Sequence, residues 1–449
     1  MPKRYRRNAS GLGLGLCLLA LLWAPPASGD KRDDELERKA TLFRDALVER
    51  HLSREGVVLY RVNLQTIQSD LQDGRYPNLA DAPTFTGQLA AAMCARAKKA
   101  ETPEADLALA EIALSGLEAL MHVTGRPGLF ARSLRRDAGR DVTGLSGDWH
   151  PADAPYENFV FRSDASADQY ANGILPAIAE CAERFPRRSR DLIVAIAGHL
   201  DQNQLRLMDV DGERTRYGDL SPRSGFGFNS IFKVTGYAVF VLASRLDSDP
   251  RWVERRDQLR DEARVPAESK LTNLRVLGIT NHSNDLMAWN LYRVLIPLAR
   301  SERDPALDDL LDGMQRARKR VAPYKNAYLD AVYCLLEEEQ CTPELRAQIQ
   351  DELARFPLDK TLRGSPPELE DWPRRWIPGR KWRRLARDLV PIELRAPSSF
   401  EWKSSPYRLT RAPVPNHEYT GTDYLAAWAL ARPLTGYRAA KPRCPQGNP

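Results

Sequence analysis

Apolar residues recur every three to four positions through most of the chain, a period that predicts α-helices. After Thr102-Pro103-Glu104, which supplies an N-cap, a first-turn proline and an early acid, an apolar stripe continues to Thr124-Gly125. Ser166-x-x-Gln169 is a capping-box pattern and opens a helix that runs to Cys181. Similar patterns predict helices at about 33–52, 192–200, 226–245, 250–262, 284–299, 305–320, 324–338, 342–355 and 423–431.

Short polar connections join most of these helices, so neighbours are expected to pair as antiparallel hairpins. A long series of hairpins cannot hide both faces unless it curves or closes on itself. We therefore predict an all-α fold, an α/α toroid over residues 30–356 with loops at one end that shape a cleft. His199, on an apolar helix face, is expected to be a core histidine.

One β-hairpin interrupts the helical pattern. Gln204–Val210 and Glu213–Tyr217 flank Asp211-Gly212, which is a typical hairpin turn. The surrounding Asp-x-Asp-Gly resembles part of a calcium loop, but Leu207 and Gly218 occupy positions where such a loop needs ligands. We interpret the segment as a hairpin and predict no metal site.

The composition changes after residue 356. Prolines and tryptophans accumulate through 357–449, and Arg374–Arg387 is basic without any acid. We predict an irregular segment that packs on the toroid. Its arginines would either bind an anionic polymer or pack over buried aromatic side chains.

The first 29 residues have the pattern of a signal peptide: a basic start, an apolar run over Leu12–Trp23 and small residues before Asp30. A periplasmic or secreted protein is expected, with no transmembrane segment in the mature chain. Without the four basic residues at the start, the formal charge falls from +6 to +2, which excludes the charge pattern of a nucleic-acid binder. Export permits disulfides, and Cys334–Cys341 and Cys94–Cys181 are the expected pairs, which leaves Cys444.

The segment Trp149–Tyr170 combines aromatic residues, an arginine and carboxylates just before a predicted helix. Asp164 and Asp168 are candidate catalytic residues, because two carboxylates across a cleft are sufficient for glycosidic hydrolysis. The candidate substrate-binding residues of this segment are Trp149, Arg162, Gln169 and Tyr170, and Tyr217 would lie at the same mouth. The alternative is structural: an acid in a first helical turn stabilises the helix dipole.

A second cluster, Asn281-His282-Ser283-Asn284-Asp285, also precedes a helix. His282 is a candidate general base with Asn281 and Asn284 as substrate-binding neighbours, the equipment of a polysaccharide lyase. The alternative is a helix-capping cluster. No P-loop, GxGxxG, GxSxG or HExxH is present, so no cofactor is predicted.

Four segments, Thr124–Gly139, Ser163–Gly173, Asp209–Asp219 and Asn281–Leu295, resemble a family of exported bacterial proteins without an assigned activity. The layout also resembles six-hairpin glycosidases such as the unsaturated glucuronyl hydrolases, which implies aspartates lining a toroid. The sequence thus favours a glycan-active enzyme, a glycoside hydrolase first and a lyase second. The alternative from another class is a non-catalytic envelope protein that binds a poly- or oligosaccharide or a protein.

Overall fold

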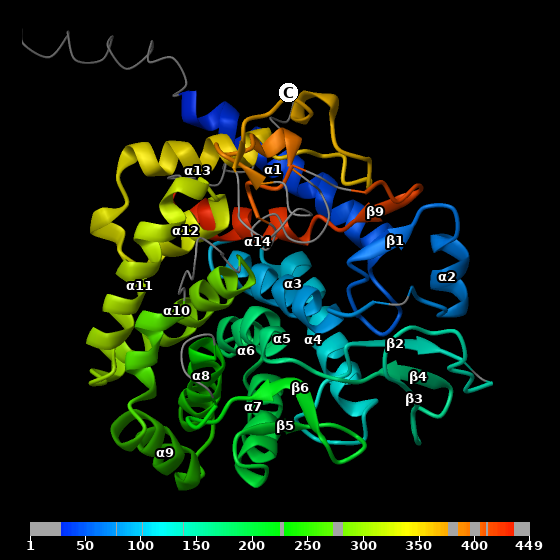
Figure 1. Cartoon of the computed structure of the whole chain (residues 1–449), viewed down its shortest axis with the longest axis vertical. Helices are drawn as coiled ribbons and strands as arrows, with labels where there is room; N and C mark the ends of the chain where they lie inside the picture. The colour runs from blue at the N-terminus through cyan, green and yellow to red at the C-terminus, as the bar shows by residue number, and fades with distance from the viewer. Residues whose placement is uncertain are drawn as a thin grey trace, which may run out of the picture.

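The computed structural model describes residues 28–77, 79–100, 102–137, 139–224, 229–272, 282–375, 385–395, 405–409 and 412–434. Its helices form two concentric rings (Figure 1). Each member of the inner ring packs against the next, and the last packs against the first, so the ring is closed. In order, the inner helices are α3 (Ala82–Ala97), the continuous run α5 (Ala167–Gln169), η2 (Tyr170–Ile174) and α6 (Leu175–Cys181), then α8 (Ser230–Leu246), α10 (His282–Glu302), α12 (Ala327–Leu336) and α14 (Thr422–Ala431).

An outer helical segment packs against each inner one. The outer segments are α4 (Glu104–His122), α7 (Pro186–Gln202), α9 (Pro250–Asp257) with η3 (Gln258–Glu262) and η4 (Val265–Leu271), α11 (Leu307–Val321), α13 (Pro343–Arg355) and α1 (Ser28–Ala46). The predicted α/α toroid is confirmed, and in the described residues it contains six pairs of an inner and an outer helical segment, five of which are hairpins of consecutive helices. α1 and α14 make the sixth, so the ring does not end at residue 356: α14 is one of its inner helices.

Helix α3 was not predicted, and its burial explains why. Nearly all of its side chains are buried, so it carries no polar stripe that would reveal a helical period. Its backbone comes very close to η2, since a Cβ on Gly87 would lie only 2.3 Å from the carbonyl carbon of Gly173. Small residues here allow the inner helices to approach this closely.

The interior of the ring also contains a short polar chain. Pro176 has no N–H to donate to the carbonyl of Asn172, four residues earlier. The amide of Gln88 on α3 donates to that carbonyl at 3.1 Å, and the amide of Asn290 on α10 donates to the Asn172 side chain at 3.3 Å. Three inner helices are thereby joined at a position where one of them lacks a donor.

The connections differ sharply between the two ends of the ring. Each inner helix before α14 is joined to the next outer helix by a short link. The connections from an outer helix to the next inner helix contain most of the residues outside the ring. Because the inner helices run parallel, the long connections gather where the inner helices begin, an end that we call the mouth. Helix α2 (Ile67–Asp73) and every strand lie in these connections.

The predicted hairpin is present as β5 (Arg206–Met208) and β6 (Arg214–Asp219), with Gly212 at a φ of 87° in its turn. Three further small antiparallel sheets were not predicted. They are β2 (Ser133–Arg136), β4 (Phe159–Arg162) and β3 (Trp149–Pro151) in that order, β1 (Arg61–Asn63) with β9 (His417–Tyr419), and β7 (Arg374–Arg375) with β8 (Leu385–Ala386). The β1–β9 pair ties the first long connection to the last.

Covalent and ionic links reinforce the closure. The disulfides Cys94–Cys181 and Cys334–Cys341 are both present, as predicted. In β9, Glu418 accepts hydrogen bonds from Arg50 at 2.9 Å and from His51 at 3.3 Å. Burial alone would raise the pKa of Glu418, but these two partners outweigh it and hold the pKa at about 2.

None of the helices in the described part of the chain is both long and apolar enough to cross a membrane. Residues 1–27 of the predicted signal peptide lie outside the described residues, as do Trp376, Trp382, Trp402 and Cys444.

Candidate functional site

The two predicted clusters of site residues lie at the mouth of the ring. Asp164 and Asp168 are in the long connection from α4 to α5, and His282 and Asn284 are in the first turn of α10. Helices α5 and α10 contact one another, so the fold brings both clusters to one end of the ring. Asn281 lies outside the described residues.

Asp164 is the most constrained of these residues. Its φ of 64° is in the left-handed region, which is strained for a side chain other than glycine but tolerated best by Asn and Asp. Its N–H donates to Asp209 Oδ2 at 2.8 Å, and its carbonyl accepts from the Arg132 guanidinium at 2.8 Å. Its Oδ1 accepts from the backbone N–H of Arg216 at 2.9 Å, whereas Oδ2 makes no hydrogen bond with the described residues. One carboxylate oxygen is therefore held in place and the other is available.

Asp168 is the second residue of the inner helix, within the predicted capping box of Ser166 and Gln169, which is present. The N–H of Ser166 donates to Gln169 Oε1 at 3.1 Å, and the Ser166 hydroxyl donates to the Asp168 carboxylate. Asp168 is partly exposed, so it is accessible from the mouth. Its place in the first turn also stabilises the helix dipole, and the structural and chemical roles are compatible.

Three of the predicted substrate-binding residues are buried, which contradicts substrate contact. Gln169 and Tyr170 are 0% exposed and Trp149 is 7% exposed. The Tyr170 hydroxyl donates to the carbonyl of Gly128 at 2.8 Å, and burial raises its pKa. The Gln169 amide donates to the carbonyl of Ala80 at 2.8 Å. These side chains position the loops from below and are not part of the exposed surface.

Arg162 and Tyr217 remain at the surface of the site. Arg162 is partly exposed and donates to the carbonyl of Leu79 at 3.3 Å. Tyr217 is 52% exposed, and its backbone forms a parallel bridge with Ser166, between the two candidate aspartates. An exposed ring beside carboxylates can stack on a sugar face.

Asp81 and Arg132 belong to the same polar surface, although the sequence patterns did not point to them. Asp81 directly precedes α3, and Arg132 reaches its carboxylate at 3.4 Å while bonding the carbonyls of Ala80 and Asp164. Burial, and then the Asp81 carboxylate, raise the pKa of Tyr60 to about 12. Arg132 thus joins the connections that lead into α3 and α5. A lone Asp before a proline-containing helix start gives no signal beyond a cap.

Asp209 was interpreted only as part of a hairpin, and its role is more specific. It is 8% exposed, and besides the Asp164 N–H its carboxylate accepts from the N–H of Val210 at 2.8 Å. At the base of the hairpin, His199 accepts from the N–H of Met208 at 3.0 Å and is 7% exposed. The hairpin is thus fixed to the ring at one side and holds Asp164 at the other.

The second cluster forms a compact group of titratable side chains. His282 Nδ1 lies 3.6 Å from Asp285 Oδ2, and the Tyr324 hydroxyl donates to that same oxygen at 3.4 Å. The His282 and Tyr324 rings are 5.1 Å apart between centroids. His282 and Asn284 are partly exposed and Asp285 is buried, so the carboxylate can orient the imidazole.

Within the described ranges, no group of three or more His, Cys, Asp or Glu side chains is arranged to hold a metal ion. No protein-family model and no curated protein matches the chain. Among solved structures, the chain is similar to a family 76 glycoside hydrolase from a bovine Bacteroides thetaiotaomicron strain. The two share 10% sequence identity and a TM-score of 0.45, over 89% of this chain and 77% of that chain. The assignment of the toroid rests on the helix packing described above.

Proposed function

We propose that this protein is a glycan-active enzyme, a glycoside hydrolase that acts through Asp164 and Asp168 at the mouth of the ring. The observation that carries the proposal is the geometry of Asp164. Three hydrogen bonds hold this residue in a strained backbone conformation, while one carboxylate oxygen makes no bond with the described residues. Backbone strain that the surroundings maintain is typical of functional positions.

Hydrolysis of a glycosidic bond needs one acid to protonate the leaving oxygen and one carboxylate to activate water or attack the sugar. Asp164, with its available Oδ2, suits the second task. Asp168, partly exposed and close in sequence, suits the first. Tyr217 would stack on the sugar beside them, and Arg132 and Asp81 would bind its hydroxyl groups.

A screen of purified protein against acidic and neutral polysaccharides tests this function, with release of reducing sugar as the readout. Asp164→Asn and Asp168→Asn should each abolish release without lowering the melting temperature. On the sugar so identified, Asp168→Asn should retain activity toward an aryl glycoside with a good leaving group, because such a bond needs no protonation. Glycan binding without turnover in the wild-type protein and in both variants would instead indicate a non-catalytic binding protein.

The group of His282, Asp285 and Tyr324 favours a lyase as the second candidate. A histidine oriented by a carboxylate can abstract the proton next to a uronate carboxyl group, and the imidazolium so formed can then protonate the leaving oxygen. A lyase would generate an unsaturated product that absorbs in the ultraviolet. That absorbance should then disappear in His282→Ala and persist in Asp164→Asn.

The proposed location is the periplasm or the medium. The two disulfides support it, because such bonds persist in oxidising compartments. Fractionation of cells that express the full chain, with mass spectrometry of the mature N-terminus, tests both export and cleavage before Asp30. An intact N-terminus in the cytoplasmic fraction would contradict this location.

A further inference from the structure

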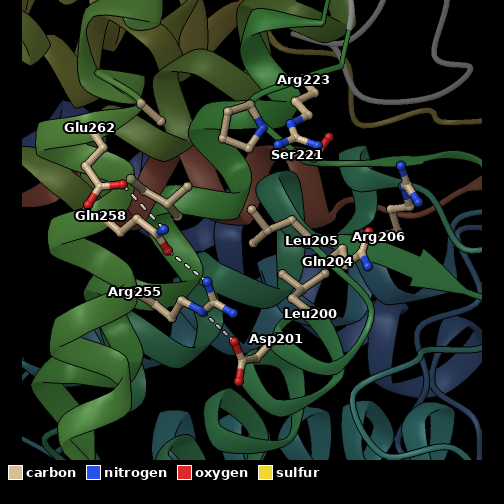
Figure 2. Close-up of a pocket in the computed structure, with 13 residues that line it drawn as sticks. Leu200, Asp201, Gln204, Leu205, Arg206, Ser221, Arg223, Arg255, Gln258 and Glu262 are labelled. Carbon is tan, nitrogen blue, oxygen red and sulfur yellow. Dashed lines mark hydrogen bonds and ion pairs between the residues drawn. The ribbon is translucent and has the colours of Figure 1, made fainter.

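A pocket lies outside the centre of the ring, with a volume of about 520 Å³. It is bounded by the C-terminal end of α7, the β5–β6 hairpin and the outer segment η3 (Figure 2). In Figure 2, Leu200 and Leu205 lie across from the helix that carries Arg255 and Gln258. This size is typical of small-ligand sites, and most of the lining side chains are polar, with Leu200, Leu205 and Leu259 forming an apolar wall.

The charges around the pocket are unbalanced in favour of cations. Arg255 is neutralised by Asp201 at 2.5 Å and also bonds Gln258 at 2.8 Å. Arg206 and Arg223 are exposed at its edge, and the guanidinium group of neither makes a hydrogen bond or ion pair with the described residues. Glu262 is the one lining acid besides Asp201. The lining therefore has two guanidinium groups without a partner among the described residues and one acid, Glu262, that no ion pair neutralises, and this balance favours an anionic ligand.

The backbone that places the apolar wall of the pocket is strained at two residues. Gln204 and Leu205 have φ values of 54° and 64°, in the left-handed region where a leucine is a strained choice. The reversal is fixed on both sides, because the N–H of Leu205 donates to the carbonyl of Leu200 at 2.7 Å and its carbonyl accepts from Leu220 at 2.9 Å. A glycine would adopt this conformation more easily but would leave the pocket without its leucine side chain.

We propose that this pocket binds a carboxylate-bearing sugar unit of the glycan that is cleaved at the mouth, an inference that rests on the proposed function. Arginine forks bind carboxylates in a bidentate manner, and leucine side chains pack against the apolar face of a sugar ring. One hairpin borders both places: Arg206 on β5 lines the pocket, and Tyr217 on β6 lies beside Ser166 at the mouth. The pocket would therefore hold a unit of the polymer at a distance from the cleaved bond.

Calorimetric titration of Asp164→Asn, which should not cleave its ligand, tests this site with trigalacturonate, trimannuronate and neutral maltotriose as probes. At least one acidic trisaccharide should bind ten or more times more tightly than maltotriose, and added salt should weaken it. Adding Arg206→Ala and Arg223→Ala should weaken that binding at least about tenfold, the magnitude expected for lost charge-assisted hydrogen bonds. Arg187→Ala in the same background is the matched control, because Arg187 lies at the opposite end of α7 with its side chain 93% exposed.

Equal binding of acidic and neutral probes, no binding of either acidic probe, or an unchanged affinity after loss of both arginines would overturn the inference. The two proposals also fail separately. Arginine-dependent binding that persists while Asp164→Asn cleaves polysaccharide normally would overturn the catalytic role and leave the pocket assigned. Loss of cleavage in Asp164→Asn with no arginine-dependent binding would support the catalytic role and overturn the assignment of the pocket.

Discussion

The backbone N–H of Asp164 donates to Oδ2 of Asp209 at 2.8 Å, across a separation of 45 residues. The bond joins two long connections that meet at the mouth of the ring. It gives Asp209 a positioning role, since its carboxylate fixes the loop on which a candidate catalytic residue lies.

Asp209→Ala should therefore lower kcat far more than it lowers stability. Loss of the acceptor leaves a backbone donor unpaired, which costs about 1–3 kcal/mol in the free energy of unfolding. Asp209→Asn should rescue kcat in part, because its amide oxygen still accepts the bond. Asp211→Ala is the control: it lies in the same hairpin but only accepts from the N–H of Glu213. Equal losses of kcat in Asp209→Ala and Asp211→Ala would show that Asp209 has no specific role.

The left-handed backbone at Asp164 predicts a difference between two small substitutions. Asparagine tolerates this conformation about as well as aspartate, whereas alanine does not. Asp164→Ala should thus reduce the free energy of unfolding by about 1–2 kcal/mol, and Asp164→Asn should leave it nearly unchanged. Urea denaturation measures both values. Identical stabilities for the two variants would mean that the strain is not present in solution.

His199 should make the β5–β6 hairpin sensitive to pH. Burial lowers its pKa below the ordinary value of 6.5, so the folded protein keeps the ring neutral while the unfolded chain takes up a proton. The free energy of unfolding should therefore be constant above about pH 6.5 and fall as the pH drops below it. His199→Gln should remove that dependence between pH 7 and 5. The exposed His122 supplies the control. If the pH dependence of the free energy of unfolding persisted in His199→Gln but disappeared in His122→Gln, it would not come from His199.

The two disulfides should contribute unequally to stability. Cys94–Cys181 joins two inner helices across 87 residues, whereas Cys334–Cys341 spans 7. If the bonds act by restricting the unfolded chain, replacing the first pair by alanine should cost about 4–5 kcal/mol and the second about 2–3 kcal/mol. Guanidinium denaturation under oxidising conditions compares them. A larger loss for the shorter loop would exclude this mechanism.

Much of the ring could be predicted from the sequence because the outer helices alternate between buried and exposed faces. The long α11, with Leu310 and Met314 inward and Asp308 outward, was found within two residues of its bounds. Helix α3 could not be found in this way, because its side chains are buried on nearly every face. The last helix was located, but its membership in the ring depends on contacts with residues more than three hundred positions earlier.

The candidate site divides along similar lines. Asp164 and Asp168 stood out because the first lies just before a capped helix and the second lies in its first turn. Local patterns do not show the depth of a side chain, however: Tyr170 is fully buried, whereas Tyr217 is 52% exposed. Asp81 and Arg132 join the site only because two connections far apart in sequence meet at the mouth, which is a property of the closed ring.

The most direct test of the account is the rate of reducing-sugar release by Asp164→Asn on the polysaccharide that the screen identifies, measured beside its melting temperature. We predict a fall in kcat of about 10²- to 10⁴-fold, as expected for loss of a catalytic acid or base, with the melting temperature unchanged. A variant that melts with the wild type and releases sugar at the wild-type rate would contradict the role of Asp164.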